Sequence, residues 1–127
     1  MSRLLFDTNI VIHIVNGTEG SLPKRLRDAI VTKGASFGIS VVSLWEMSIK
    51  LAVGKLELGE PLTIVPAMLG RLAVEVLPMS LQHALEVAHP EPATKDPFDR
   101  LLLAVCACEG MKLVTTDARL TGHRLVW

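Results

Sequence analysis

Hydrophobic residues along this chain form short unbroken runs that alternate with longer segments of helical periodicity. The short runs predict buried strands at residues 3–6, 36–40, 74–77 and 112–115, with a possible fifth at 124–127. Apolar residues at helical spacing predict helices over residues 10–15, 21–32, 41–53, 62–72, 80–88 and 97–109. Because strands alternate with helices, the pattern predicts a parallel sheet that is covered on both faces.

Residues that start and stop helices agree with this pattern. Asp96 is a good N-cap and Pro97 a good first helical residue, and Gly110 ends the same helix. Ser40 or Ser43 is the candidate cap of the helix over 41–53. We therefore predict an α/β fold with three α/β/α layers and a central parallel sheet of four to five short strands, formed by one domain over residues 1–127.

Composition narrows the class of protein without fixing its function. Half of the 127 residues are hydrophobic, and the formal net charge is zero, which argues mildly against a nucleic-acid partner because such proteins are usually basic. Cys106 and Cys108 form no CxxC pattern, so we expect small buried hydrophobes in a reducing compartment. No signal peptide is recognisable, and no run approaches the ~20 apolar residues of a membrane span, so a cytoplasmic protein is expected.

Four acidic residues fall where a parallel sheet would gather them. Asp7 follows the first strand and Asp117 the fourth, while Glu46 and Asp99 lie near the starts of two helices. In open parallel sheets the carboxyl ends of the strands and the starts of the following helices share one edge, which is where ligands bind. Each acid alone also has an ordinary explanation, as a helix cap, an exposed helical residue or a partner of the helix dipole.

Convergence of these acids would have an electrostatic cost. Two carboxylates ~4 Å apart repel by about 4 kcal/mol at an effective dielectric of ~20. A cluster of them requires protonation or a cation, and Mg²⁺ or Mn²⁺ is the dication that prefers oxygen ligands. No set of His and Cys residues offers a competing zinc site.

Four segments together resemble PIN-domain proteins, specifically VapC-like toxins of type II toxin–antitoxin systems. They are Leu4-Leu5-Phe6-Asp7-Thr8-Asn9, the segment 40–50 (SVVSLWEMSIK) followed by Gly54-Lys55-Leu56, Asp96-Pro97-Phe98-Asp99-Arg100-Leu101-Leu102, and Leu113-Val114-Thr115-Thr116-Asp117. The resemblance implies catalytic and metal-binding roles for Asp7, Glu46, Asp99 and Asp117, with supporting polar roles for Thr8, Asn9, Ser43 and Thr115. Asp96 is either a further support or only the helix cap. The family often has a histidine at the position of Thr94, so the sequence weakens any claim of a histidine-assisted step.

The implied activity is endonucleolytic hydrolysis of RNA by a water that Mg²⁺ or Mn²⁺ activates, with Asp7 or Glu46 as proton acceptor. Candidate phosphate contacts are Lys50, Lys55, Arg100 and Arg119. Trp45 could stack a base, although core packing is the favoured interpretation. His13, His83 and His123 are expected to be structural or surface residues. The resemblance also implies a homodimer and a cognate VapB-like antitoxin, whose contacts could include Leu44, Trp45 and Ile49, and it implies no membrane.

Two alternatives remain open at this stage. One is a PIN-like module that binds RNA or protein without cutting. The other is a phosphatase of the haloacid-dehalogenase kind, which also begins with an apolar strand ending in aspartate. That class has two aspartates separated by one residue, whereas Asn9 occupies the second position here.

Overall fold

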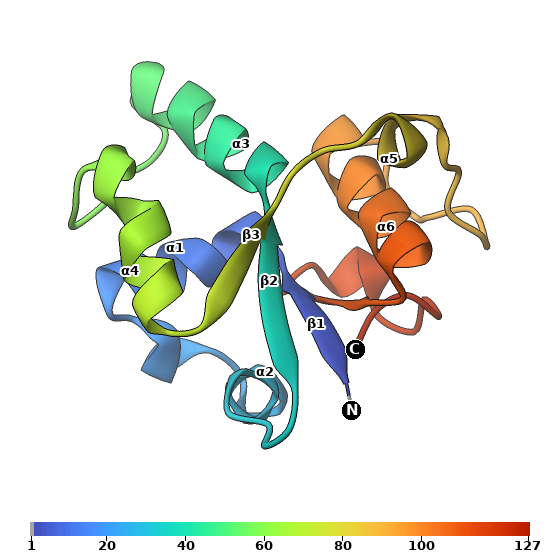
Figure 1. The fold of residues 1–127 in the computed structure, drawn as a ribbon, viewed down its shortest axis with the longest axis horizontal. Coiled ribbons are helices and arrows are strands. Elements are labelled where there is room, and N and C mark those ends of the chain that lie inside the picture. The colour runs from blue at the N-terminus through green and yellow to red at the C-terminus, as the bar shows by residue number, and fades with distance from the viewer. Residues whose placement is uncertain (1) are drawn as a thin grey trace.

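Four parallel strands lie between two layers of helices in the computed structural model, which describes residues 2–127 (Figure 1). The sheet has the order β3-β2-β1-β4 and consists of β1 (Arg3–Phe6), β2 (Ser36–Ser40), β3 (Val74–Leu77) and β4 (Lys112–Val114). The predicted three-layer fold with a parallel sheet is thereby confirmed. The possible fifth strand does not form, because residues 124–127 make a single bridge, between Leu113 and Val126.

Helices connect successive strands. They are α1 (Thr8–Asn16), α2 (Lys24–Ile30), α3 (Val41–Ala52), α4 (Val65–Arg71), α5 (Leu81–Leu85) and α6 (Pro97–Glu109), and three short 3₁₀ turns are η1 (Glu19–Ser21), η2 (Leu62–Ile64) and η3 (Ala118–Leu120). The prediction over 21–32 was too long, because Pro23 has an extended ψ of 148° and precedes α2. The prediction over 80–88 was also too long, since Leu85 and Val87 are exposed and give further turns nothing to pack against.

The central strand β1 is buried on both faces. Leu4 and Phe6 point into a core shared with α1, α2 and α4, whereas Leu5 points into a second core formed mainly by α6. This alternation is the two-residue period of a strand, and it explains why β1 is an unbroken apolar run. In Figure 1 the two layers lie on opposite sides of the sheet, with α1, α2 and α4 on the left and α5 and α6 on the right.

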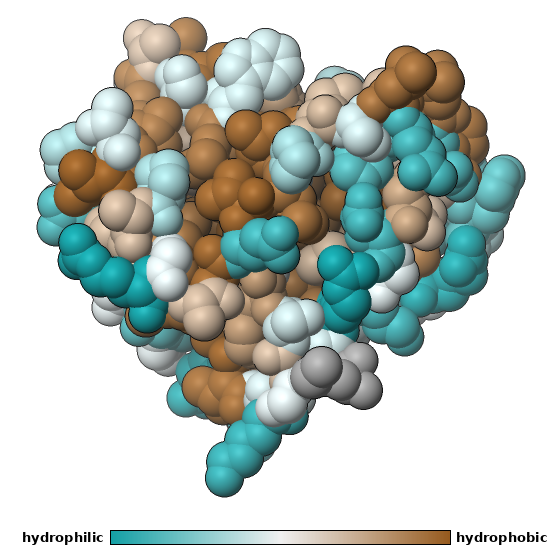
Figure 2. Space-filling model, in the orientation of Figure 1, coloured by the Kyte–Doolittle hydropathy of each residue, from teal (hydrophilic) through white to brown (hydrophobic). Residues whose placement is uncertain are grey.

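Apolar side chains also reach the surface. Figure 2 shows them gathered in the middle of one face, around the edge strand β3, and again at the upper right, where Figure 1 places α5. On α5, Leu81 and Leu85 are 76% and 72% exposed. Cys106 is buried as predicted, but Cys108 is partly exposed. Within residues 2–127, no helix combines the length and the apolar character that crossing a bilayer requires.

Candidate functional site

Asp7 lies at the junction of β1 and α1. It is the N-cap of α1, and its Oδ1 accepts a hydrogen bond of 2.7 Å from the Thr8 backbone N–H. Its Oδ2 accepts a 2.6 Å hydrogen bond from the Thr115 hydroxyl, which follows β4. With 5% of its surface exposed, Asp7 is held firmly from two adjacent strands at the carboxyl edge of the sheet.

Glu46 approaches the same edge from α3. Ser40 caps this helix through a hydrogen bond to the Val42 N–H, so Ser40 rather than Ser43 is the cap. The Thr8 hydroxyl donates to Glu46 Oε1 at 2.7 Å and lies 3.0 Å from the Ser43 hydroxyl. Lys50, one turn further along α3, pairs with Glu46 Oε2 at 2.9 Å. These contacts hold the Glu46 side chain toward α1.

The start of α6 supplies two more carboxylates. Asp96 caps the helix as predicted, accepting from the backbone N–H groups of Phe98 and Asp99 at 2.8 and 3.2 Å. Asp99 lies in the first turn, and its Oδ2 accepts a 3.2 Å hydrogen bond from the buried Thr94 hydroxyl. The same hydroxyl accepts from the Asp96 N–H, so Thr94 fixes the entrance of α6 and the Asp99 side chain together.

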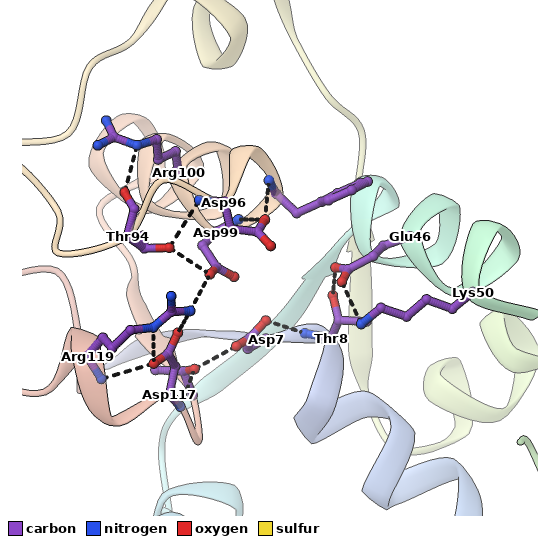
Figure 3. Close-up of polar contacts among 12 residues, drawn as sticks. Asp7, Thr8, Glu46, Lys50, Thr94, Asp96, Asp99, Arg100, Asp117 and Arg119 are labelled. Carbon is purple, nitrogen blue, oxygen red and sulfur yellow. Dashed lines mark hydrogen bonds and ion pairs between the residues drawn. The ribbon is translucent and has the colours of Figure 1, made fainter. Parts of the chain in front are cut away.

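Asp117 follows β4 and caps η3 through the Arg119 N–H. The Arg119 guanidinium makes a two-pronged contact with Asp117, with distances of 3.0 Å to Oδ1 and 2.7 Å to Oδ2. It also lies 3.7 Å from Asp99 Oδ2. Arg119 therefore bridges two of the carboxylates, as Figure 3 shows.

All four predicted acids line one pocket of about 300 Å³. Its walls also include Thr8, Asn9, Lys50, Asp96 and Arg119. Five carboxylates face two cations there, which leaves three excess negative charges if every group is ionised. Figure 3 shows the acids around a common space: Asp7, Glu46 and Asp117 come from separate parts of the chain, and Asp96 and Asp99 come from the start of α6. As the side chains stand, no three Asp, Glu, His or Cys residues within 2–127 are arranged to hold a metal ion.

The crowding of negative charge changes the acidity of the carboxyl groups. Burial raises the pKa of Asp7, and the charges of Glu46 and Asp117 add to this, while the Thr115 hydrogen bond opposes it. Burial, followed by the charges of Asp7 and Asp96, raises the pKa of Asp99 to about 6. Asp117 behaves differently, because the Arg119 hydrogen bonds lower its pKa. The pocket thus lacks enough positive charge for its buried acids.

Two of the four basic residues proposed to contact RNA lie elsewhere. Lys50 and Arg119 line the acidic pocket, whereas Lys55 is exposed outside it. Arg100 also lies outside the pocket, where its guanidinium donates a 2.8 Å hydrogen bond to the Thr94 carbonyl and another to the Glu91 carboxylate. Arg100 and Arg119 both line a neighbouring pocket at the loop before α6.

The three histidines considered earlier lie outside the acidic pocket, and each has a local hydrogen-bond partner. His13 pairs with the Thr18 hydroxyl, buried His83 with Glu109, and His123 with the Pro90 carbonyl.

The favoured interpretation of Trp45 as a core residue was wrong, because its side chain is 62% exposed. Ser43 and Met47 are fully buried and define the inner face of α3. Trp45 is two residues from each, which places it about 200° around the helix from both. With the inner face of α3 known from the structure, this spacing accounts for the exposure of Trp45.

Sequence reasoning also missed two residues. Thr94 was noted only as a departure from the family pattern, yet it orients Asp99. Its position two residues before the Asp96 cap is a recognisable local hydrogen-bonding pattern. Phe98 was read only as part of a motif, but it contacts Trp45 across the two helices, a tertiary contact with no local signal.

Comparison with known proteins agrees with the fold. The sequence model of the PIN domain matches residues 4–123, nearly the whole chain. The search of curated proteins found no match to this chain. PIN domains are generally nucleases and typically use divalent metal ions. The extent of the match, which includes every strand end that carries an acid, shows that this chain belongs to the PIN domain family.

Proposed function

We propose that this protein is an endoribonuclease that depends on Mg²⁺ or Mn²⁺ and uses Asp7, Glu46, Asp99 and Asp117 to hold the ion. The observation that carries the proposal is the acidic pocket, in which carboxylates from separate elements outnumber the available cations by three. Such a concentration of charge costs folding free energy, and it persists in proteins mainly where a function requires it.

The donor set suits a hard dication. The candidate ligands in the pocket are carboxylates, and Mg²⁺ and Mn²⁺ prefer oxygen ligands of this kind. Two cationic side chains partly neutralise these carboxylates: Lys50 pairs with Glu46, and Arg119 pairs with Asp117 and Asp99. An ion would compete with both, so its binding is expected to draw the acids away from these partners. Bound there, it would supply Lewis acidity and lower the pKa of water near the scissile phosphate.

The residues of the chain would divide the remaining work. Asp7 is buried and held by hydrogen bonds to both carboxylate oxygens, so it is positioned to accept a proton from the attacking water. Thr115 and Thr8 fix the orientation of the Asp7 and Glu46 carboxylates. Lys50 and Arg119, once released from the acids, are at the correct edge of the pocket to contact phosphate oxygens of RNA.

The biological setting is proposed from the resemblance to VapC-like toxins. We infer a toxin of a toxin–antitoxin pair that acts in the cytoplasm, forms a homodimer and is inhibited by a VapB-like antitoxin. The exposed side chain of Ile49 provides apolar surface for such contacts. A non-catalytic PIN-like module is the alternative that experiment must exclude, while the family match argues against a phosphatase of the haloacid-dehalogenase kind.

A cleavage assay with a matched variant tests the proposal. Labelled single-stranded RNA is incubated with the protein in Mg²⁺, in Mn²⁺ and in EDTA. Asp7→Asn should lower the rate at least about a hundredfold, although asparagine can still cap α1 and preserve the fold. Asp28→Asn, which changes an exposed acid on α2, should cleave at the normal rate. Cleavage that survives in EDTA or in Asp7→Asn would contradict the proposal.

A further inference from the structure

Two of the five aromatic residues in this chain meet beside the acidic pocket. The rings of Trp45 on α3 and Phe98 on α6 have centroids 5.6 Å apart and are inclined at 54°. Phe98 is partly buried, whereas 62% of Trp45 is exposed. A tilted aromatic pair is favourable beyond its buried area, so Phe98 restrains the indole while leaving much of its surface open.

The position of the pair links it to the candidate site. Trp45 directly precedes Glu46, and Phe98 directly precedes Asp99. Both acids line the pocket, and α3 contacts α6 at this end of the molecule. The aromatic contact therefore connects the two helices that carry acids on opposite sides of the pocket. An extended polynucleotide whose phosphate lies in the pocket would have a neighbouring base within reach of this rim.

We propose that Trp45, positioned by Phe98, stacks against an unpaired nucleobase next to the phosphate that is cleaved. The inference rests on the proposed nuclease function and extends it to the unpaired state of the RNA, because an unpaired base offers an exposed face that a base inside a duplex does not. Every base has such a face, so stacking favours unpaired RNA without selecting a sequence. Lys50 and Arg119 provide positive charge in the same pocket for the adjoining backbone.

Binding can be measured separately from cleavage. In EDTA, a Trp127→Phe background leaves Trp45 as the single indole, whose fluorescence reports stacking directly. A short oligouridylate should quench this fluorescence, and an abasic strand of equal length should quench it far less. In fluorescence anisotropy of a dye-labelled strand, which needs no tryptophan in the protein, Trp45→Ala should weaken binding of oligouridylate by about five- to 150-fold, the range expected for one base–aromatic stack. It should leave binding of the abasic strand unchanged.

Matched variants show whether the loss is specific. Trp45→Phe should retain most of the affinity, because a smaller ring still stacks. Leu85→Ala removes an equally exposed apolar side chain on α5 and should have no effect. Phe98→Leu should weaken oligouridylate binding less than Trp45→Ala, since it removes only the support of the indole.

Two results would overturn the inference. One is equal affinity of Trp45→Ala and the parent protein for oligouridylate. The other is a role in protein contact: Val41, Trp45 and Ile49 are exposed at four-residue spacing along α3. If Trp45→Ala and Ile49→Ala both disrupted self-association in sedimentation and neither affected RNA binding, this face would be a protein interface.

Failure of the nuclease proposal can be distinguished from failure of this inference. In that case the parent protein would not cleave RNA in Mg²⁺ or Mn²⁺, whatever the result of the quenching experiment.

Discussion

Replacing Asp99 by asparagine should stabilise the metal-free protein above about pH 6 and leave its stability unchanged below about pH 3. The Asp99 carboxyl is only 18% exposed, and burial together with the charges of Asp7 and Asp96 raises its pKa to about 6. In the unfolded chain the same group ionises near its ordinary value of 3.8. The folded state therefore opposes an ionisation that the unfolded state allows.

The sign of the effect follows from this difference. Below about pH 3 the carboxyl is protonated in both states, and it costs the fold nothing. Between about pH 4 and 6 the unfolded chain releases this proton while the folded protein must either retain it or accept a buried charge, so its stability falls, and the loss is complete above about pH 6. Asparagine never ionises and avoids that loss. Its carbonyl can still accept the hydrogen bond from Thr94.

The magnitude can be worked from the pKa. A rise from 3.8 to about 6 is about two units, which at about 1.4 kcal/mol each sets a ceiling near 3 kcal/mol. Asp99 lies at the mouth of an open pocket, where solvent screens much of this, and the variant also loses a weak contact with Arg119. The expected gain is therefore about 1 kcal/mol, or about 3 to 5 °C in Tm for a chain of this size.

Urea unfolding monitored by tryptophan fluorescence, in EDTA, measures this gain at several pH values. The reasoning predicts coincident curves at low pH that separate as the pH is raised. Asp28→Asn serves as the control, since Asp28 is exposed and pairs with Lys24 on α2. A loss of stability in Asp99→Asn at all pH values would refute the reasoning, because it would mean that the carboxylate contributes favourable contacts that outweigh its desolvation.

Variants at three further positions test individual contacts. Asp96→Ala should destabilise the protein by about 1 kcal/mol in thermal unfolding, whereas Asp96→Ser should not, because serine can still cap α6. If Asp96→Ser also cleaves RNA at the normal rate, the role of Asp96 is limited to capping the helix. Thr115→Val removes the 2.6 Å hydrogen bond to Asp7, so it should lower the free energy of unfolding by about 2 kcal/mol near neutral pH. Because that hydrogen bond lowers the pKa of Asp7, its loss should also shift the pH–rate profile of RNA cleavage to higher pH. An unshifted profile would mean that cleavage does not depend on the ionisation of Asp7. Arg119→Gln frees Asp117 and Asp99 and should tighten Mn²⁺ binding by about fivefold in calorimetry, while weaker binding would show that Arg119 supports the ion instead of competing with it.

Much of the fold follows from features that are local in the sequence. Short apolar runs give the four strands, and Asp96-Pro97 and Gly110 give the bounds of α6. The positions of the acids could be predicted because parallel topology alone brings strand ends and the following helix starts to one edge. Asp7 and Asp117 are also helix caps, so their ordinary explanations hold alongside any function.

Several features that sequence reasoning missed depend on tertiary contacts. Residues 125–127 are apolar, but they make one bridge to β4 instead of a strand. Arg119 was expected to contact RNA, and nothing in the sequence places its guanidinium between Asp117 and Asp99. The contact of Phe98 with Trp45 depends in the same way on how α3 and α6 are packed together.

The central claim is that the clustered acids hold a dication, and calorimetric titration of the protein with Mn²⁺ tests it most directly. The account predicts saturable uptake that Asp7→Asn abolishes or greatly weakens and that Asp28→Asn leaves intact. Absence of uptake by the unaltered protein, or equal uptake by Asp7→Asn, would contradict it.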